Sequence, residues 1–323
     1  MLKFWSVLAI ILILAGCTDD TIDMPKQISI ENTIFVSHIK EKTMSAIDAT
    51  NGTKASVSMP FVFSAIEELK PGLFLATVKE SDKLYQIDVR KQKITPFMDL
   101  EKGALDLAYD KEGKSLYLAN VETNQVLVID ISEKKVSEKI DVGAYPSHLF
   151  LHNEKLFVLA AGSENIAVVD KATKGILNTF DVNPRPEGLF FDGNYVWTGG
   201  HGEGAETNKR IFGYDPKTGE EKLSVETGLM PIQIKQYEKD GPMYVLSHGD
   251  HTVAKIDPKT YEVEKKVTLS DNPTNMIADD KEIFVTSLDG NELTKININD
   301  FEITGSYPTE SGPYLLFKGG EEK

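Results

Sequence analysis

The sequence contains a single cysteine, Cys17, and lacks several motifs that would indicate a particular chemistry. One cysteine cannot form an intramolecular disulfide bond, so packing and strand pairing must hold the folded domain together. No Cys-x-x-Cys-His segment occurs, which excludes covalent attachment of a c-type haem. Gly-x-Ser-x-Gly and His-Glu-x-x-His segments are absent as well. Covalent catalysis and a short-motif metal site are therefore not predicted, and no motif indicates a cofactor.

Positive charge is scarce. Lys and Arg total 35 against 50 Asp and Glu, which gives a formal net charge of −15 at pH 7. Such a surface repels nucleic acids and anionic lipid headgroups. The hydrophobic fraction of 41% and the charged fraction of 26% are those of an ordinary folded domain, and 323 residues are enough to bury a large core. The composition thus predicts a folded protein with no nucleic acid partner.

Long hydrophobic runs are absent except at the N-terminus. Residues 4–14 are almost wholly apolar and follow Lys3. This run is shorter than the roughly 20 residues that a membrane-spanning helix needs. A positively charged start, a short apolar centre and the small residues Ala15 and Gly16 before Cys17 are the pattern of a signal peptide. We expect residues 1–16 to direct export and to be removed.

The segment Leu14-Ala15-Gly16-Cys17 resembles the bacterial lipobox at every position. The resemblance implies cleavage before Cys17 and attachment of diacylglyceryl, with palmitate-type chains, to its sulfur. Because two or more acyl chains give stable attachment, the mature protein is expected to be anchored in the lipid bilayer and to face outside the cytoplasm. We expect residues 17–27 to be a lipidated tether and residues 28–323 to be the folded domain.

A repeat of 40 to 45 residues runs through the rest of the chain. Its most regular position is an Asp or Asn after an apolar residue: Asp48, Asp88, Asp130, Asp170, Asp215, Asp257 and Asn297. This period is that of a β-propeller blade, which consists of four antiparallel strands. In Asp215-Pro216-Lys217-Thr218-Gly219 the acid precedes turn residues. We therefore expect these side chains to accept backbone hydrogen bonds in turns, and not to form a ring of catalytic carboxylates.

The two ends of the chain are complementary parts of one repeat. Residues 34–37 align with the second strand of the later repeats. Residues 312–317 align with a first strand, and no further strand pattern follows them. The sequence thus predicts an all-β fold, a seven-bladed propeller in which the C-terminal strand completes blade one. Closing the ring removes exposed edge strands.

The second strands carry a family resemblance. Leu116–Asn120, Ile34–Ser37 and Ile283–Ser287 resemble degenerate forms of the Tyr-Val-Thr-Asn repeat, and Val142-Gly143-Ala144-Tyr145-Pro146 resembles the junction between repeats in that family. The mature chain is similar over nearly its whole length to YVTN-type propellers. The resemblance implies the fold and an extracytoplasmic setting, but no particular chemistry, because members differ widely in function.

Candidate ligand-binding residues gather on one face of the predicted ring. The loops between strands two and three, and those between strand four and the next blade, share a face, which we call the loop face. Imidazoles and carboxylates concentrate there, and neutral imidazole is a common ligand of zinc, copper and iron. The candidates are His38, His148, Glu187, His201, Glu203 and His248. With about one histidine per blade, the sequence does not decide whether these side chains converge.

Two interpretations of this face stay open. The first is a non-catalytic module that presents the loop face to an envelope protein, a glycan or a small ligand. The alternative is a metal-binding or metal-dependent enzyme, lyase-like or redox, that uses the same histidines and glutamates.

Residues 199–204, with the sequence Gly-Gly-His-Gly-Glu-Gly, are the most unusual local stretch. They do not form a dinucleotide-binding motif, because they lead into a strand and not into a helix. The stretch is either a loop built of residues that tolerate positive φ or a flap over the mouth of the central channel.

Overall fold

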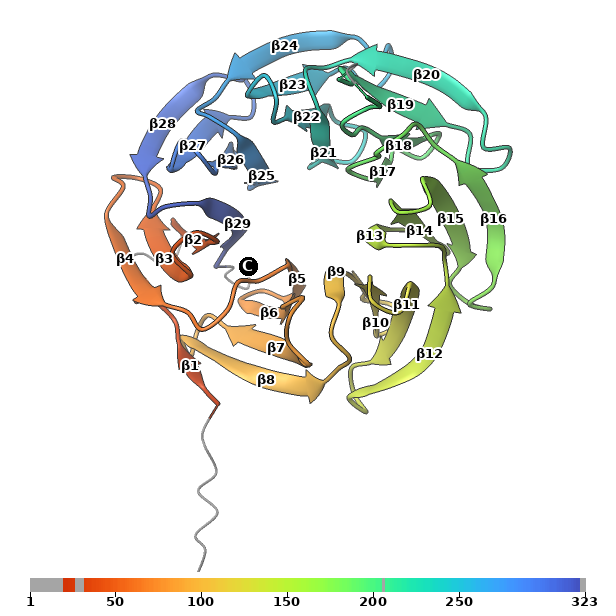
Figure 1. Cartoon of the computed structure of the whole chain (residues 1–323). Helices are drawn as coiled ribbons and strands as arrows, with labels where there is room; N and C mark the ends of the chain where they lie inside the picture. Colours follow the sequence, from red (N-terminus) through yellow and green to blue (C-terminus); the bar gives the residue numbers. More distant parts are fainter. Residues whose placement is uncertain (1–19, 27–31, 205–206, 320–323) are drawn as a thin grey trace, which may run out of the picture.

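The computed structural model describes residues 20–26, 32–204 and 207–319, and the regular structure over these residues consists of 29 β-strands and no helix. The strands form seven sheets around a central axis (Figure 1). This confirms the predicted all-β, seven-bladed propeller with four antiparallel strands in each blade. Cys17 and residues 1–16 lie outside the described residues. In the ranges that are described, no helix has the length and apolar character needed to cross a membrane.

The blades follow one another around the ring, and within each blade the strands run in order from the axis outward. Blade one consists of β29 (Pro313–Lys318), β2 (Thr33–His38), β3 (Thr43–Asp48) and β4 (Lys54–Ser58). Blade two consists of β5 (Ala65–Lys70), β6 (Leu73–Thr77), β7 (Lys83–Asp88) and β8 (Lys93–Asp99). Blade three consists of β9 (Ala104–Asp110), β10 (Ser115–Asn120), β11 (Gln125–Asp130) and β12 (Lys135–Asp141). Blade four consists of β13 (Pro146–His152), β14 (Lys155–Ala160), β15 (Asn165–Asp170) and β16 (Ile176–Asp181).

The remaining three blades have the same order. Blade five consists of β17 (Phe190–Phe191), β18 (Val196–Thr198), β19 (Arg210–Tyr214) and β20 (Glu221–Glu226). Blade six consists of β21 (Pro231–Gln236), β22 (Met243–Ser247), β23 (Thr252–Ile256) and β24 (Val263–Thr268). Blade seven consists of β25 (Pro273–Ala278), β26 (Glu282–Ser287), β27 (Glu292–Asn297) and β28 (Ile303–Pro308).

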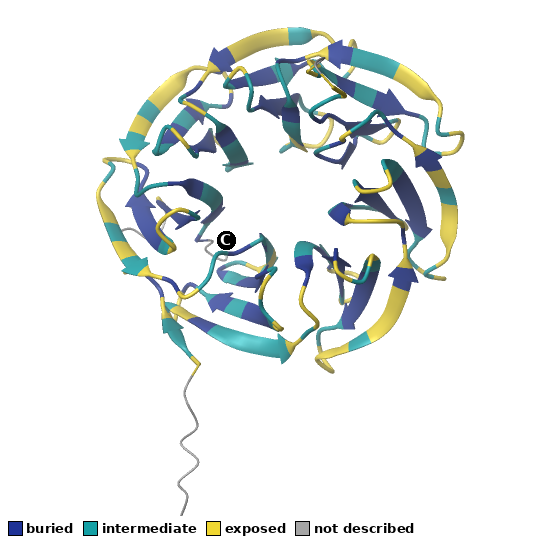
Figure 2. Cartoon of the chain, viewed as in Figure 1, coloured by how far each residue is buried: buried dark blue, intermediate teal, exposed yellow. Residues whose placement is uncertain are grey.

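Burial changes from the middle of each blade to its rim. All six residues of β2 are buried, whereas five of the seven residues of β12 are exposed. Second and third strands pack against neighbouring blades on both faces, so their side chains are apolar on both faces. Fourth strands face solvent, which explains their Lys and Glu content. Figure 2 shows the exposed residues concentrated on the outer strands.

The repeated Asp and Asn residues hold turns, as predicted. In every repeat the side-chain oxygen accepts a hydrogen bond of 2.7 to 3.2 Å from a backbone N–H two or three residues later. These are Asx-turns between the third and fourth strands. The prediction that these side chains accept backbone hydrogen bonds in turns is confirmed.

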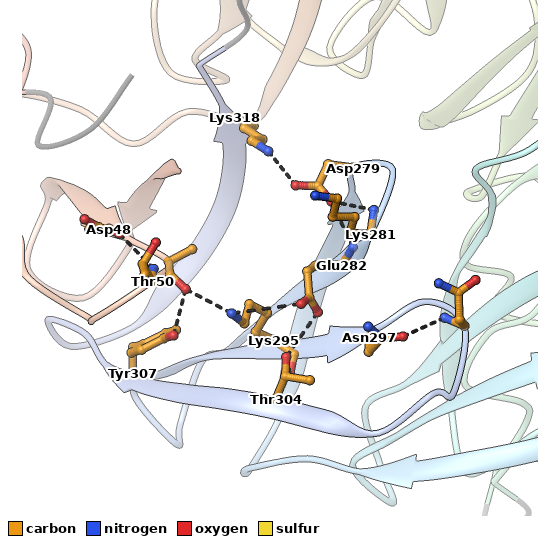
Figure 3. A network of polar contacts seen from close by, with 12 residues as sticks. Asp48, Thr50, Asp279, Lys281, Glu282, Lys295, Asn297, Thr304, Tyr307 and Lys318 are labelled. Atoms are coloured by element: carbon orange, nitrogen blue, oxygen red, sulfur yellow. Dashed lines mark hydrogen bonds and ion pairs between the residues drawn. The ribbon is translucent and has the colours of Figure 1, made fainter. Parts of the chain in front are cut away.

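The C-terminal strand closes the ring, also as predicted. β29 pairs with β2, from Ile34 opposite Lys318 to His38 opposite Pro313. A polar network joins blade seven to blade one (Figure 3): Lys318 donates to Asp279, and the Tyr307 hydroxyl donates to the carbonyl oxygen of Ala49 at 2.7 Å. The two ends of the chain are thus fastened by both backbone and side-chain bonds.

A short strand, β1 (Ile22–Asp23), adds a fifth strand to the rim of blade two. Ile22 pairs with Ile94, and Asp23 pairs with Lys93. Met24 is buried, and its N–H donates to the carbonyl oxygen of Gln92 at 3.0 Å. The sequence suggests a first strand only near Ile28, because a two-residue strand has no periodicity to detect. Part of the range 17–27 assigned to the tether is therefore folded onto the propeller.

Candidate functional site

The innermost strands of several blades begin with the same local geometry. Pro146, Pro231 and Pro273 are the first residues of β13, β21 and β25. The residue before each proline has a φ of 54° to 55°, which turns the chain sharply into the channel. A β-bulge follows directly, so that the strand register shifts by one residue.

The residue after each bulge lines the central channel. It is His148 in blade four, Gln233 in blade six and Asn275 in blade seven. Blade three has the same bulge without the proline, and Asp106 occupies the corresponding position. The same bulge thus presents one polar side chain to the channel in each of these four blades.

The channel contains a cavity of about 780 Å³ that all seven blades line. It reaches the loop face, because side chains from the loops between second and third strands contribute to it. Its polar and titratable lining residues include, in blade order, Tyr314, Glu67, Asp106, His148, Glu187, His201, Gln233, Lys235, His248 and Asn275.

His201 and His248 face each other across the boundary between blades five and six. Their Nε2 atoms are 3.1 Å apart, and their rings are nearly perpendicular, at 87°. At this distance one Nε2–H donates to the lone pair of the other nitrogen. Burial and the neighbouring His248 lower the pKa of His201, which favours a neutral ring.

A chain of polar contacts determines which nitrogen carries the proton. The side-chain amide of Asn272 donates through Nδ2 to Asp289 Oδ2 at 2.9 Å, so its Oδ1 is the atom that faces His248 Nδ1 at 3.1 Å. The carboxylate of Asp289 can only accept, so it faces the amide nitrogen of Asn272. The amide oxygen of Asn272 also accepts and faces His248, hence the neutral ring of His248 carries its proton on Nδ1. The Nε2 atom of His248 is therefore a lone-pair acceptor, and His201 is the donor of the pair.

Gly200 and the backbone hydrogen bonds around it fix the position of His201. Gly200 has φ 123°, and a Cβ at this residue would lie 2.2 Å from the carbonyl oxygen of Arg185. The Gly200 N–H donates to Pro231 O at 2.7 Å, and the His201 N–H donates to Arg185 O at 3.0 Å. The positive φ expected of this stretch is confirmed at Gly200, and the bonds fasten residues 199–201 to the entry segments of blades five and six.

A second pair lies on the other side of blade five. His148 Nε2 is 3.4 Å from Glu187 Oε1, and both side chains are about one-third exposed. His148 Nδ1 is 3.0 Å from the hydroxyl of Ser147. The channel thus presents an imidazole–carboxylate pair beside an imidazole–imidazole pair.

Two carboxyl groups line the channel in poorly solvated positions. Loss of solvent raises the pKa of Glu67 to about 7, and desolvation also raises the pKa of Asp106. Each accepts a backbone hydrogen bond from the next blade: Glu67 Oε1 from Tyr109 N at 3.1 Å, and Asp106 Oδ2 from Leu149 N at 2.7 Å. These side chains therefore join adjacent blades and present a carboxyl to the cavity at the same time.

The structure brings four of the six candidate residues together and places the other two, His38 and Glu203, elsewhere. His148, Glu187, His201 and His248 line the central cavity. His38 is fully buried at the end of β2, where burial lowers its pKa and its Nε2 is 3.7 Å from Glu310 Oε2. Glu203 lines a different pocket of about 390 Å³, together with Lys209 and Arg210.

Several residues of the cavity were not found by the sequence reasoning. Glu67 and Asp106 lie on first strands that do not begin with a proline, so an alignment of the repeats on their prolines does not find them. Asn272 has a detectable signal, because it precedes Pro273 in the position of Tyr145 before Pro146. Over the described ranges, no group of three or more His, Cys, Asp and Glu side chains is arranged to hold a metal ion.

Comparison with known proteins agrees with the fold. No model of a protein family matches the sequence, and no curated protein matches it. A functionally unknown protein from Desulfotomaculum acetoxidans has a similar structure, with a TM-score of 0.72 and 12% identity over 90% of this chain and 100% of that chain. A protein from Lactobacillus plantarum has a TM-score of 0.70 and 16% identity, over 88% of this chain and 98% of that chain.

Dihydro-heme d1 dehydrogenase NirN in complex with DHE is also similar in structure. Its TM-score is 0.59 at 11% identity, over 92% of this chain and 77% of that chain. At these identities the likeness concerns the fold alone, and it identifies the chain as a β-propeller.

Proposed function

We propose that this chain is an exported lipoprotein, anchored in the membrane through acylated Cys17, whose propeller binds a small polar ligand in its central cavity without transforming it. The observation that carries the proposal is the cavity of about 780 Å³, in which two side-chain pairs of complementary chemistry meet at the loop face. This volume is within the range of small-molecule sites, roughly 300 to 1,000 Å³.

The lining favours a ligand that carries both donors and acceptors. Glu187 and Asp106 supply carboxyl groups, while Lys235 supplies a cation and Gln233 an amide. A large apolar ligand would leave these groups without partners, which costs free energy for each desolvated polar atom. NirN, a protein of similar fold, is described in complex with DHE. This supports ligand binding by a protein that contains such a fold.

The attachment of β1 supports a particular orientation at the membrane. Asp20 forms an ion pair of 2.8 Å with Lys83, the first residue of β7, and this end of β7 lies at the loop face. Cys17 precedes Asp20 by three residues, which span at most about 11 Å. In the proposed arrangement, the loop-face rim of blade two lies beside the bilayer and the cavity opens close to the membrane surface.

Fractionation and ligand capture test the proposal together. Wild-type protein is expected in the membrane fraction with an acylated N-terminal cysteine, and Cys17→Ser in the soluble exported fraction. A small-molecule extract of the envelope should contain a component that the wild-type domain retains and that a His148→Ala, Glu187→Ala double variant does not. Turnover of that component by the purified protein would contradict the non-catalytic part of the proposal.

A further inference from the structure

We infer that His201 and His248 form an open two-histidine site for a transition-metal ion of the zinc and copper class at the wall of the central cavity. This inference deepens the proposed function, because it names a ligand class for the same cavity. It rests on the short distance of 3.1 Å between the two Nε2 atoms.

The distance between the two nitrogens matches that of two ligands on one ion. Imidazole nitrogens bind Zn²⁺ at about 2.0 to 2.1 Å, and a tetrahedral angle then separates two such nitrogens by about 3.3 Å. The observed separation is 3.1 Å. The two nitrogens therefore already lie near the separation that one ion requires, and the rings have to rotate so that both lone pairs point at the ion. Because both Nε2 atoms must offer a lone pair to the ion, the proton that His201 carries on Nε2 moves to its Nδ1 when the ion binds, and both rings stay neutral.

The hydrogen bond that orients one of the two ligands, His248, is already in place. Histidines that bind metals usually donate their other N–H to a carboxylate or a carbonyl, which fixes the tautomer and the direction of the ring. His248 donates from Nδ1 to Asn272 Oδ1, and Asn272 is held in turn by Asp289. Asp289 is paired with Lys40 at 2.8 Å. This arrangement selects the tautomer of a neutral His248 that has its lone pair on Nε2, the nitrogen that faces His201.

The first ligand is also held in position before binding. The backbone of His201 is fastened through the bonds of Gly200 and His201 to the entries of blades six and five. A preorganised pair loses little freedom when the ion arrives.

The donor set selects the class of metal. Ca²⁺ and Mg²⁺ prefer oxygen ligands, whereas imidazole suits Zn²⁺, Cu²⁺ and Ni²⁺. Two protein nitrogens leave the remaining coordination positions open to water or to donor atoms of a second ligand in the cavity. The negative charge of Glu187 acts on His201 from the same cavity and compensates part of the charge of an incoming ion.

The test is metal titration of the full-length protein in detergent after treatment with a chelator. We expect one Cu²⁺ or Zn²⁺ per chain by isothermal titration calorimetry. Pulsed electron paramagnetic resonance of the Cu²⁺ form should show coupling to the remote nitrogens of two imidazoles. His201→Gln and His248→Gln should each abolish stoichiometric binding, and Asn272→Leu should weaken it by about 10- to 100-fold.

His251→Gln is the matched control. His251 lies on the same loop as His248 but pairs with Asp271, its Nδ1 being 3.2 Å from Oδ1 of that residue. Its replacement should leave the affinity unchanged, and thermal unfolding of every variant should show that the propeller is intact. Absence of binding by the wild type, or equal binding by folded His201→Gln and His248→Gln, would overturn the inference. Retention of an envelope component by a protein that binds no metal would overturn the metal site alone, and would leave the proposed function standing.

Discussion

The Nε2 atoms of His201 and His248 lie 3.1 Å apart, although 47 residues separate the two histidines in the chain. They belong to neighbouring blades, and each sits in the loop between the second and third strands of its blade. The repeat therefore brings equivalent loops together at the mouth of the channel, where one blade supplies a donor and the next an acceptor.

The first prediction concerns the glycine that positions His201. Gly200→Ala should lower the free energy of unfolding by about 1 to 3 kcal/mol, because the backbone has φ 123° and the new Cβ would meet the carbonyl oxygen of Arg185. It should also displace His201 and weaken metal binding. Urea unfolding and copper titration measure the two effects.

Gly204→Ala is the control for this substitution. Gly204 also has a positive φ, of 61°, but among the described residues, its chain neighbours apart, no atom lies within 4 Å of the place that a Cβ would occupy. The cost should be limited to that of the backbone conformation, and metal affinity should be unchanged. Equal loss of copper binding in both variants would show that the loop, and not the contact at Gly200, controls the position of His201.

The second prediction concerns Glu67. Because its folded-state pKa is raised to about 7, the ionised form destabilises the fold. Glu67→Gln keeps the acceptor for Tyr109 N–H and should raise the free energy of unfolding at pH 8 by on the order of 1 to 3 kcal/mol. The gain should shrink as the pH falls from about 7 towards the unfolded-state pKa. Chemical unfolding at pH 8, 6 and 4 checks this, and a gain independent of pH would contradict the assignment.

The third prediction concerns the acid stability of the turns. Backbone hydrogen bonds lower the pKa of Asp215 and of Asp257 below its usual range. A carboxyl with a depressed folded-state pKa stabilises the protein above its unfolded pKa, and the stabilisation is lost as the pH falls through the folded value. Asp215→Asn retains the acceptor oxygen without the titration. The variant should therefore lose less stability than the wild type when the pH falls from 5 to 2, as followed by thermal unfolding.

The turns and the ring could be predicted because their signals are local. An Asx-turn needs one Asp and the two or three residues after it, and the blade period repeats these signals seven times. The meeting of His201 with His248 could not be predicted, since it depends on the angle between blades. The same holds for Glu67, whose pKa is raised mainly by its burial in the packing around the channel.

The fourth prediction concerns ring closure. Phe317 on the C-terminal strand is buried and stacks on Phe35 of β2, with ring centroids 5.0 Å apart. Phe317→Ala should cost about 3 to 5 kcal/mol, because it leaves a cavity between the first and last parts of the chain. Leu177→Ala, at a residue that is 57% exposed on β16, should change stability little. Similar midpoints for the two variants in urea unfolding would contradict the role of closure.

The fifth prediction concerns orientation at the membrane. Once Cys17 is acylated the chain has no other thiol, so a single introduced cysteine can be labelled selectively. A fluorophore at Asp82→Cys, on the loop-face rim of blade two, should be quenched by brominated lipids in proteoliposomes. The same label at Glu203→Cys, in the corresponding loop of blade five, should be quenched much less. Equal quenching at both positions would exclude the proposed orientation.

The most direct test of ligand binding in the central cavity is a thermal-shift measurement with fractionated small molecules from the envelope, on wild-type protein and on the His148→Ala, Glu187→Ala double variant. A ligand at 100 times its dissociation constant adds about 2.7 kcal/mol to the stability of the protein that binds it. We expect at least one fraction to raise the melting temperature of the wild type and to leave that of the variant unchanged. If every active fraction stabilises both proteins equally, or none stabilises the wild type, the central cavity is not the ligand site.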